Sequence, residues 1–395
     1  MQEKTSAPAI RFAGFSDDWE QRKLGEYCEM YNGDRSSKYP NAQDMVSDGI
    51  PFINAGDLED GCVNLTTANK ITREKYDDLG GVKLQFGDIV YCLRGTLGKN
   101  AYINNFTEGT VASSLVAIRP KNIDGRYLFH VLNSDIEYRQ RILYDEGAAQ
   151  PNLSAKNVSG FMIPIPDMDE QKKISACLDN LNNLITLHQR KYSRLCNIKR
   201  SMIERMFPRE GATVPEIRFT GFTDAWEQRK TKDLCSISTG KSNTQDSVED
   251  GMYPFYVRSQ IVEHSNRYLF DEEAVLTVGD GVGTGKVFHY VNGKYDLHQR
   301  VYRMFDFSNE ITAKYFYYYF SDRFYDRVMA MTAKTSVDSV RYEMIADMDI
   351  AVPKIQEQIA ISVMFERFDH LITLHQRKLE RLQNIKKAYL EKMFV

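Results

Sequence analysis

Hydrophobic residues along the chain follow a strand-like pattern in some stretches and a helical spacing in others, and the two kinds of stretch alternate twice. In residues 84–92 and 114–119, β-branched and aromatic residues cluster between Gly, Asn and Pro positions, and residues 274–278 and 300–304 repeat this pattern. Such clusters predict strands. Residues 127–142 and 315–331 have helical periodicity, with aromatic residues on one face. The pattern therefore predicts two small α+β domains.

A long amphipathic helix is predicted after each domain. The first begins at a predicted capping box, in which Asp167 accepts a backbone N–H and Glu170 reaches back. Long or apolar side chains then recur at alternating spacings of three and four, the pattern of a coiled-coil seam, with one slip near Ile198. These seam positions are Ile174, Leu178, Leu181, Ile185, His188, Tyr192, Leu195, Ile198, Met202 and Met206, followed in the second helix by Ile361, Phe365, Phe368, Ile372, His375, Leu379, Leu382, Ile385, Tyr389 and Met393. A helix of roughly 40 residues is about 60 Å long and cannot bury such a stripe alone, so we expect the two helices to pack on each other.

The chain is an internal duplication. Residues 10–23 (IRFAGFSDDWEQRK) return as residues 217–230 (IRFTGFTDAWEQRK), and residues 184–191 (LITLHQRK) return unchanged as residues 371–378. This period is too long for a solenoid and indicates one fold present twice. The two offsets differ by about 20 residues, which the second copy lacks between Gly33 and Gly98 of the first. A constant framework with one variable stretch is typical of a scaffold whose loops carry specificity.

The predicted fold class is α+β, with two tandem domains separated by two long helices that pack as an antiparallel coiled coil. The expected boundaries are 1–165 for the first domain, 166–208 for the first helix, 209–352 for the second domain and 353–395 for the second helix.

Composition indicates a soluble globular protein. The 395 residues are 42% hydrophobic and 27% charged. There is no signal-peptide pattern and no run approaching the ~20 apolar residues of a membrane helix, so we expect a cytoplasmic protein without a membrane partner. Six cysteines lack any C-x-x-C spacing, which favours buried free thiols over a zinc site or a disulfide framework.

The duplicated motifs resemble those of a known family. The repeated Gly-Phe-(Ser/Thr)-Asp-x-Trp-Glu-Gln-Arg-Lys segment, the Pro-rich approach to a helix bearing Glu-Gln, and the LITLHQRK helix are similar to the DNA-specificity subunit of type I restriction-modification enzymes. The resemblance covers nearly the whole chain. It implies two target-recognition domains, each reading one half of a bipartite, asymmetric site in double-stranded DNA, and two helices that set the spacer.

The resemblance also implies a chain without catalytic activity or a bound cofactor. Two modification subunits, which use S-adenosylmethionine to methylate adenine, and restriction subunits, which use ATP and Mg to translocate and cut DNA, would assemble around it. The Glu-Gln pairs at the helix starts are the expected partner-binding residues: Glu170, Gln171, Glu357 and Gln358.

The residues themselves agree that chemistry comes from a partner. An adenine methyltransferase needs an (Asn/Asp)-Pro-Pro-(Tyr/Phe) loop, and the chain has no Pro-Pro. The Gly-rich residues 279–286 lack the first glycine of a phosphate loop, and Val287 stands where a Ser or Thr would hold magnesium, so we expect a turn. The nuclease-like residues in 166–172 fall within one helical turn, which the capping box explains better.

Two further features have a structural explanation that we prefer to a functional one. His188 and His375 lack a third ligand, so hydrogen-bonded packing is favoured over a metal site. The aromatic run 314–320 could stack bases, but core packing is the preferred interpretation.

Charge does not indicate a DNA-binding protein overall, because the net charge is −3. Positive charge is instead concentrated on the long helices. Residues 188–209 hold seven Lys or Arg against one acid, and residues 375–392 hold six against two. A solvated helix face explains these clusters as well as a DNA-facing surface does, because partner subunits also supply DNA-facing charge.

The best candidates for DNA contact lie in loops that differ between the copies. Arg and Lys suit guanine O6/N7, while Asn and Gln suit adenine N6/N7. In the first copy the candidates are Arg35, Ser36, Lys38, Asn54, Arg94, Lys99, Gln150 and Asn152, and in the second they are Lys241, Asn243, Gln245, Arg258, Lys286, Lys334 and Ser336.

Two alternative functions remain open from the sequence. One is a specificity protein that serves a single-chain restriction-methylation enzyme. The other is a coiled-coil scaffold with duplicated adaptor domains that binds only protein.

Overall fold

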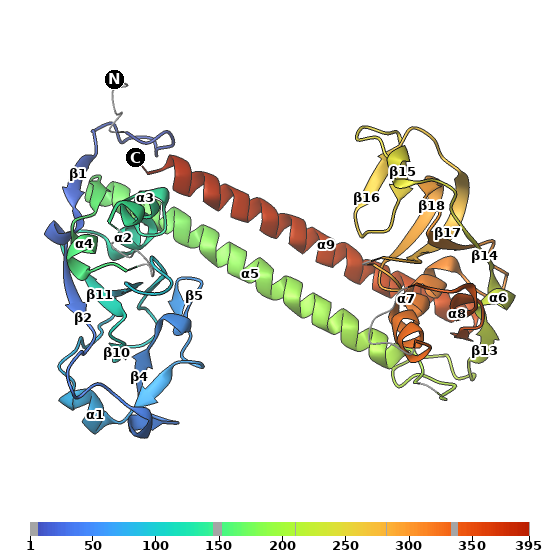
Figure 1. Cartoon of the computed structure of the whole chain (residues 1–395), viewed down its shortest axis with the longest axis horizontal. Coiled ribbons are helices and arrows are strands. Elements are labelled where there is room, and N and C mark those ends of the chain that lie inside the picture. The colour runs from blue at the N-terminus through green and yellow to red at the C-terminus, as the bar shows by residue number, and fades with distance from the viewer. Residues whose placement is uncertain (1–6, 145–151, 210, 282, 333–338, 395) are drawn as a thin grey trace. The chain divides into compact units, whose positions relative to one another are not determined.

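The computed structural model describes residues 7–144, 152–209, 211–281, 283–332 and 339–394. The chain forms two compact units, and both long helices contribute to both (Figure 1). Unit 1 comprises Met1–His188 with Arg377–Val395, and unit 2 comprises Gln189–Gln376. Each unit therefore contains one α+β domain, part of the helix that follows this domain, and part of the other long helix.

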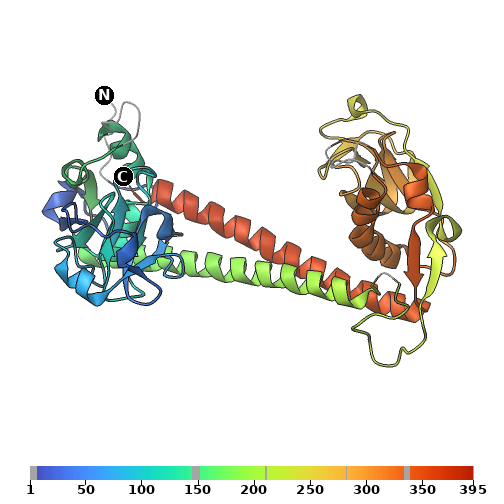
Figure 2. The same ribbon diagram turned by 60° about the horizontal axis from the view of Figure 1, so that its bottom comes forward.

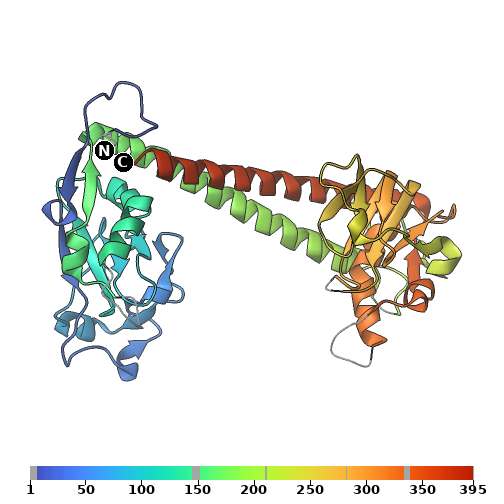
Figure 3. The same ribbon diagram turned by 45° about the horizontal axis from the view of Figure 1, so that its top comes forward.

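The long helices α5 (Met168–Met206) and α9 (Ile355–Lys392) confirm the predicted coiled-coil elements. Within unit 1 the first part of α5 and the last part of α9 lie side by side and run in opposite directions (Figure 2). Leu178 and Met393 belong to one hydrophobic cluster there. The remaining parts of the two helices do the same within unit 2 (Figure 3), where Met206 and Phe365 share a cluster.

The seam slip predicted at Ile198 is wrong. The Ile198 side chain is exposed, while the neighbouring Lys199 pairs with Asp369 of α9. Spacings of four, three and four then connect Leu195, Lys199, Met202 and Met206. The seam therefore stays on one face of α5, with the charged Lys199 at the position where the apolar Ile198 was expected.

In unit 1 two antiparallel pairs, β1-β12 and β5-β6, and two four-stranded sheets build the domain. The N-terminal strand β1 pairs with β12, which directly precedes α5. The two sheets have the orders β2-β11-β8-β9 and β10-β4-β7-β3. The elements are β1 (Glu20–Lys23), η1 (Leu24–Glu26), β2 (Cys28–Asn32), η2 (Ala42–Asp44), β3 (Met45–Val46), β4 (Ile50–Ile53), η3 (Ala55–Asp57), β5 (Leu58–Glu59), β6 (Cys62–Val63), β7 (Asn69–Ile71), α1 (Arg73–Asp78), β8 (Ile89–Cys92), β9 (Asn100–Tyr102), β10 (Thr110–Val111), β11 (Leu115–Pro120), α2 (Gly125–Val131), α3 (Asp135–Tyr144), α4 (Ala155–Ser159) and β12 (Met162–Ile165).

Unit 2 repeats this plan with a single six-stranded sheet of order β14-β19-β17-β18-β15-β16. The sheet is continuous because the long strand β18 pairs antiparallel with β17 and parallel with β15. In unit 1 the short strands β9 and β10 take these two roles, which leaves two sheets. The elements are β13 (Glu227–Lys230), α6 (Thr231–Leu234), β14 (Ser236–Thr239), η4 (Thr244–Asp246), β15 (Tyr253–Tyr256), β16 (Val262–Ser265), β17 (Phe270–Val278), β18 (Phe288–Leu297), β19 (Val301–Phe305), α7 (Ala313–Ala330), α8 (Tyr342–Ala346) and β20 (Asp349–Val352).

The helix predicted over residues 127–142 is interrupted. It is divided into α2 and α3 because polar side chains take over backbone hydrogen bonds between them. Ser134 Oγ donates to the Val131 carbonyl and accepts from the Ile136 amide, and Asn100 Nδ2 donates to the Leu132 carbonyl. The second copy has one helix, α7, close to its predicted bounds.

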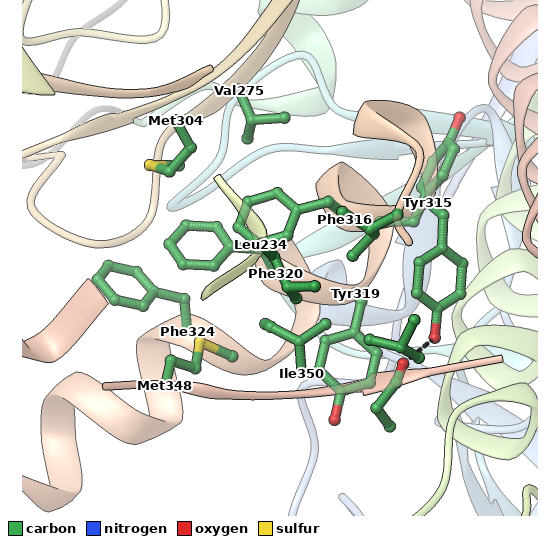
Figure 4. Packing of buried hydrophobic residues seen from close by; sticks show 14 of the residues in the cluster. Leu234, Val275, Met304, Tyr315, Phe316, Tyr319, Phe320, Phe324, Met348 and Ile350 are labelled. Atoms are coloured by element: carbon green, nitrogen blue, oxygen red, sulfur yellow. Dashed lines mark hydrogen bonds between the residues drawn. The ribbon is translucent and has the colours of Figure 1, made fainter. Parts of the chain in front are cut away.

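The aromatic run in the second copy is core, as expected. Tyr315, Phe316, Tyr319 and Phe320 are buried in the main cluster of unit 2 (Figure 4). The Phe320 and Phe324 rings stack at 4.4 Å between centroids. Because these faces are covered by neighbouring side chains, they are not available for stacking on bases.

Three smaller expectations can be compared with the structure. All six cysteines are free, but the expected burial is wrong for Cys62, which is exposed, and Cys177 and Cys196 are half-buried. None of the described helices has an apolar stretch that could span a membrane. The same residues contain no cluster of three or more His, Cys, Asp or Glu placed to hold a metal ion.

Candidate nucleic-acid interface

Backbone hydrogen bonds identify equivalent positions at the loop-bearing edge of each domain. In unit 1 the Leu93 amide donates to the Ser114 carbonyl at 2.9 Å, and in unit 2 the Gly279 amide donates to the Arg300 carbonyl at 2.8 Å. The residues that follow Leu93 and Gly279 also form isolated bridges, Arg94 with Asn152 and Asp280 with Ser339. Arg94 therefore corresponds to Asp280, and Ser114 to Arg300.

In unit 2 a cavity of about 440 Å³ brings together three predicted residues, Asn243, Gln245 and Arg258. Thr244, His298, Gln299 and Arg300 complete its lining. Gln299 Nε2 donates to Asn243 Oδ1 at 2.5 Å, so two amide side chains are held against each other at the surface. The cavity thus presents amide and guanidinium groups of the kind that read base edges.

The turn that carries Gln299 and Arg300 is fixed by its own hydrogen bonds. The Arg300 amide donates to Nδ1 of the buried His298 at 3.0 Å, and the Val301 amide donates to the His298 carbonyl at 3.0 Å. Burial lowers the pKa of His298, which favours the neutral ring that this acceptor role requires. The Gln299 amide also donates to the Ser242 carbonyl at 2.8 Å. The turn is therefore well positioned before any ligand binds.

In unit 1 the predicted residues form smaller groups. Arg94 Nε donates to Asn152 Oδ1 at 3.1 Å, so these two candidates lie together. Arg35 Nη2 donates to the Ser113 carbonyl at 3.3 Å, and Arg35 and Ser36 line a cavity of about 640 Å³. Ser113 directly precedes Ser114, which places Arg35 near the same edge as Arg94.

Several other candidates are engaged within the domain. Lys38 Nζ pairs with Asp78 at 2.5 Å, and Lys99 Nζ donates to the Ala55 carbonyl at 3.1 Å. Asn54 Nδ2 donates to the Phe52 carbonyl at 3.4 Å, and Lys286 Nζ lies 4.5 Å from the Tyr325 ring centroid. Lys241 is exposed, although it does not line the unit 2 cavity. Gln150, Lys334 and Ser336 lie outside the described residues.

Sequence reasoning missed Gln299 and Arg300. The strand there was expected to start at Arg300, but β19 starts at Val301 and leaves Arg300 in the turn. The polar triplet His298-Gln299-Arg300 before a strand was the available signal, since polar clusters between strands are typical of turns.

The Glu-Gln pairs expected to bind a partner make contacts within the two units. All four side chains are buried. Glu170 accepts two hydrogen bonds from Arg11, at 2.8 and 2.9 Å, and a third from the Trp19 indole at 3.0 Å. Glu357 likewise binds Arg218 at 2.7 and 2.8 Å.

The glutamines of these pairs accept hydrogen bonds from the residues that begin α2 in unit 1 and α7 in unit 2. Gln171 Oε1 accepts the Asp124 amide and Gln358 Oε1 accepts the Thr312 amide, at 2.9 and 2.8 Å. Asp167 caps α5 as predicted, by accepting the Asp169 amide, but Glu170 does not complete the capping box because Arg11 and Trp19 engage its carboxylate. The four residues therefore join each domain to its helix.

The basic residues of the 188–209 segment are paired from Lys199 onward. Lys199 pairs with Asp369, Arg200 with Glu204, and Arg205 with Glu216. Arg209 also approaches Glu216. This pairing favours a solvated, charge-balanced helix face for this segment.

The chain matches the family model described as the type I restriction modification DNA specificity domain twice, over residues 16–197 and 223–384. Each match covers one domain and much of the helix that follows it. The chain belongs to this specificity family.

Relatives of the specificity chain match nearly all of it or a part of it. It is 21% identical to the type I restriction enzyme MjaVIII specificity subunit of Methanocaldococcus jannaschii, over 94% of this chain and 91% of the relative. It is 26% identical to the EcoDI specificity subunit of Escherichia coli, over 40% of this chain and 34% of that one. Among solved structures, the type I restriction-modification S subunit from M. genitalium superposes with a TM-score of 0.67 at 15% identity, covering 98% of this chain and 99% of that chain. The specificity chain is a DNA-recognition subunit with one recognition domain in each unit.

Proposed function

We propose that this chain reads a bipartite, asymmetric site in double-stranded DNA, with one half read by each recognition domain. The observation that carries this proposal is the contrast between a repeated framework and a divergent edge. Both units repeat the buried Arg-Glu contact and the strand pair before the long helix. At equivalent edge positions, however, Arg94 stands where Asp280 stands in the other unit. Side chains of opposite charge at one position of the same fold suit two different half-sites.

Methyl transfer and cleavage belong to partner subunits in this proposal. Modification subunits would use S-adenosylmethionine and restriction subunits would use ATP and Mg, because the chain has no adenine-methyltransferase loop. The long helices would set the spacer between the half-sites. Assembly on DNA in the cell places the complex in the cytoplasm.

Exposed leucines at matched positions support the docking of two modification subunits. Leu184 and Leu187 in unit 1, and Leu371 and Leu374 in unit 2, lie in the identical LITLHQRK segments and are all at least 40% exposed. Because each unit presents the same apolar pair, one partner type can bind twice. Charged substitutions at Leu184 and Leu187 should remove one of two bound modification subunits, as measured by the mass of the complex.

A domain exchange tests the proposal. Residues 25–160 would be replaced by the equivalent segment of another family member, which retains the β1–β12 pair and the Arg11–Glu170 contact. Methylated adenine would then be mapped in cells that express the chimera with the modification partner. One half of the motif should change while the other half persists. A change in both halves, or no methylated motif with the parental chain, would contradict the proposal and favour the protein-binding scaffold.

A further inference from the structure

We propose that Arg258 and Arg300 of the second recognition domain read guanine in the major groove, and that Asp280 is the residue that positions them. This inference rests on the proposed function and deepens it, because it names the base-reading side chains of one half-site.

Asp280 lies between the two arginines. Its Oδ1 is 3.5 Å from Arg258 Nη1, and its Oδ2 is 3.7 Å from Arg300 Nε. The three residues come from three separate loops, after β15, after β17 and before β19. One carboxylate therefore lies within ion-pairing distance of two guanidinium groups from separate loops.

The arginines remain accessible to a ligand. Their side chains are 48% and 65% exposed, whereas that of Asp280 is 26% exposed. Two cations against one anion leave a net positive site. Each guanidinium has five N–H donors, so the contact with Asp280 leaves enough donors for a bidentate pair with guanine O6 and N7.

The position of Asp280 argues for base contact over phosphate contact. A carboxylate about 4 Å from a bound phosphate would repel it, by about 1 kcal/mol even in water and by more near a protein surface. Guanine O6 and N7 carry no net charge, so an adjacent carboxylate costs much less there. Orienting an arginine by an acid therefore suits base reading.

Unit 1 has different groups at the equivalent positions. Arg94 replaces Asp280 and Ser114 replaces Arg300. The Ala112 amide donates to the Ile53 carbonyl as the His298 amide does to the Tyr256 carbonyl, so Ala55 stands at the position of Arg258. Changes to the arginine pair should therefore affect only the half-site that unit 2 reads.

The test is competition binding by the complex of this chain with its modification partner. The competitors are duplexes in which each base pair of the methylated motif is changed singly. Arg258→Ala and Arg300→Ala should each reduce discrimination at one guanine of one half-site, roughly tenfold to a hundredfold. Arg300→Gln should shift the preference at its position toward adenine. Arg229→Ala is the matched control, because Arg229 is 44% exposed and ion-paired with Glu227.

Other results of the competition experiment would contradict the proposal. Unchanged discrimination in both alanine variants would overturn the proposal. Abolished binding to every duplex, with an unchanged melting temperature, would assign the arginines to phosphate contact and also overturn it. If the unaltered complex showed no sequence preference, the proposed function itself would fail.

Variants of Asp280 test whether it positions the two arginines. Asp280→Asn should relax discrimination at the same guanines as the arginine variants, and Asp280→Glu should restore it at least partly. If Asp280→Asn instead relaxed a different base pair, Asp280 would contact a base directly and would not be a positioning residue.

Discussion

The Ile10 amide donates a hydrogen bond to the Lys392 carbonyl at 2.9 Å, which joins the start of the chain to the end of its last helix. In unit 2 the Ile217 amide donates to the Arg205 carbonyl at the same distance. Arg205 and Ile217 are close together in the sequence, whereas Ile10 and Lys392 are far apart in it. The N-terminal segment of each domain therefore binds the last turn of a long helix through the same backbone hydrogen bond.

Each helix end should stabilise the unit in which it packs. Phe394 packs on Tyr127 in unit 1 with ring centroids 5.8 Å apart, and Phe207 packs on Tyr315 in unit 2 at 5.9 Å. Phe394→Ala should lower the free energy of unfolding of unit 1 by about 3 kcal/mol, the usual cost of such a truncation. Urea unfolding followed by Trp19 fluorescence in a Trp226→Phe background measures unit 1 separately. A Phe207→Ala change in that background should leave the Trp19 transition in place, and an equal shift from both substitutions would contradict this account.

The buried Glu170 should stabilise unit 1 instead of binding a partner. Removing its charge by Glu170→Gln leaves Arg11, which is only 14% exposed, without its anion. We expect a loss of about 3 kcal/mol in the free energy of unfolding of unit 1. Glu108→Gln is the control, because the Arg73–Glu108 pair is half-exposed and solvent screening should make its contribution small. Normal stability of Glu170→Gln combined with loss of a partner subunit would restore the original expectation.

Unit 1 should lose stability in mildly acidic solution because of His130. Burial lowers the pKa of His130 below its ordinary 6.5, against opposing contributions from Asp179 of α5, while Arg126 and Lys386 act with burial. The unfolded chain therefore binds a proton below pH 6.5 that the folded unit does not bind. The stabilisation is complete above pH 6.5 and is lost as the pH falls toward the folded-state pKa. Trp19-detected unfolding of His130→Gln should show a weaker pH dependence in this range, and an unchanged profile would assign the effect to other groups.

Patterns of hydrophobic residues predicted the fold well, and the edge residues less well. Seams such as Ile174–Leu178 predicted the long helices, because residues buried along one helix face are apolar at a regular spacing in the sequence. The break at Ser134 and the start of β19 at Val301 depend on side-chain hydrogen bonds, which the hydrophobic period does not encode. The role of Glu170 depends on Arg11, a residue 159 positions away, which no local pattern reveals.

Two unlike recognition domains should read two unlike half-sites. The most direct measurement is to map methylated adenine across the genome of a strain that carries this chain and its modification partner. We expect a single asymmetric motif, with two specified halves separated by an unspecified spacer. A symmetric or uninterrupted motif, or methylation that does not depend on this chain, would contradict the claim.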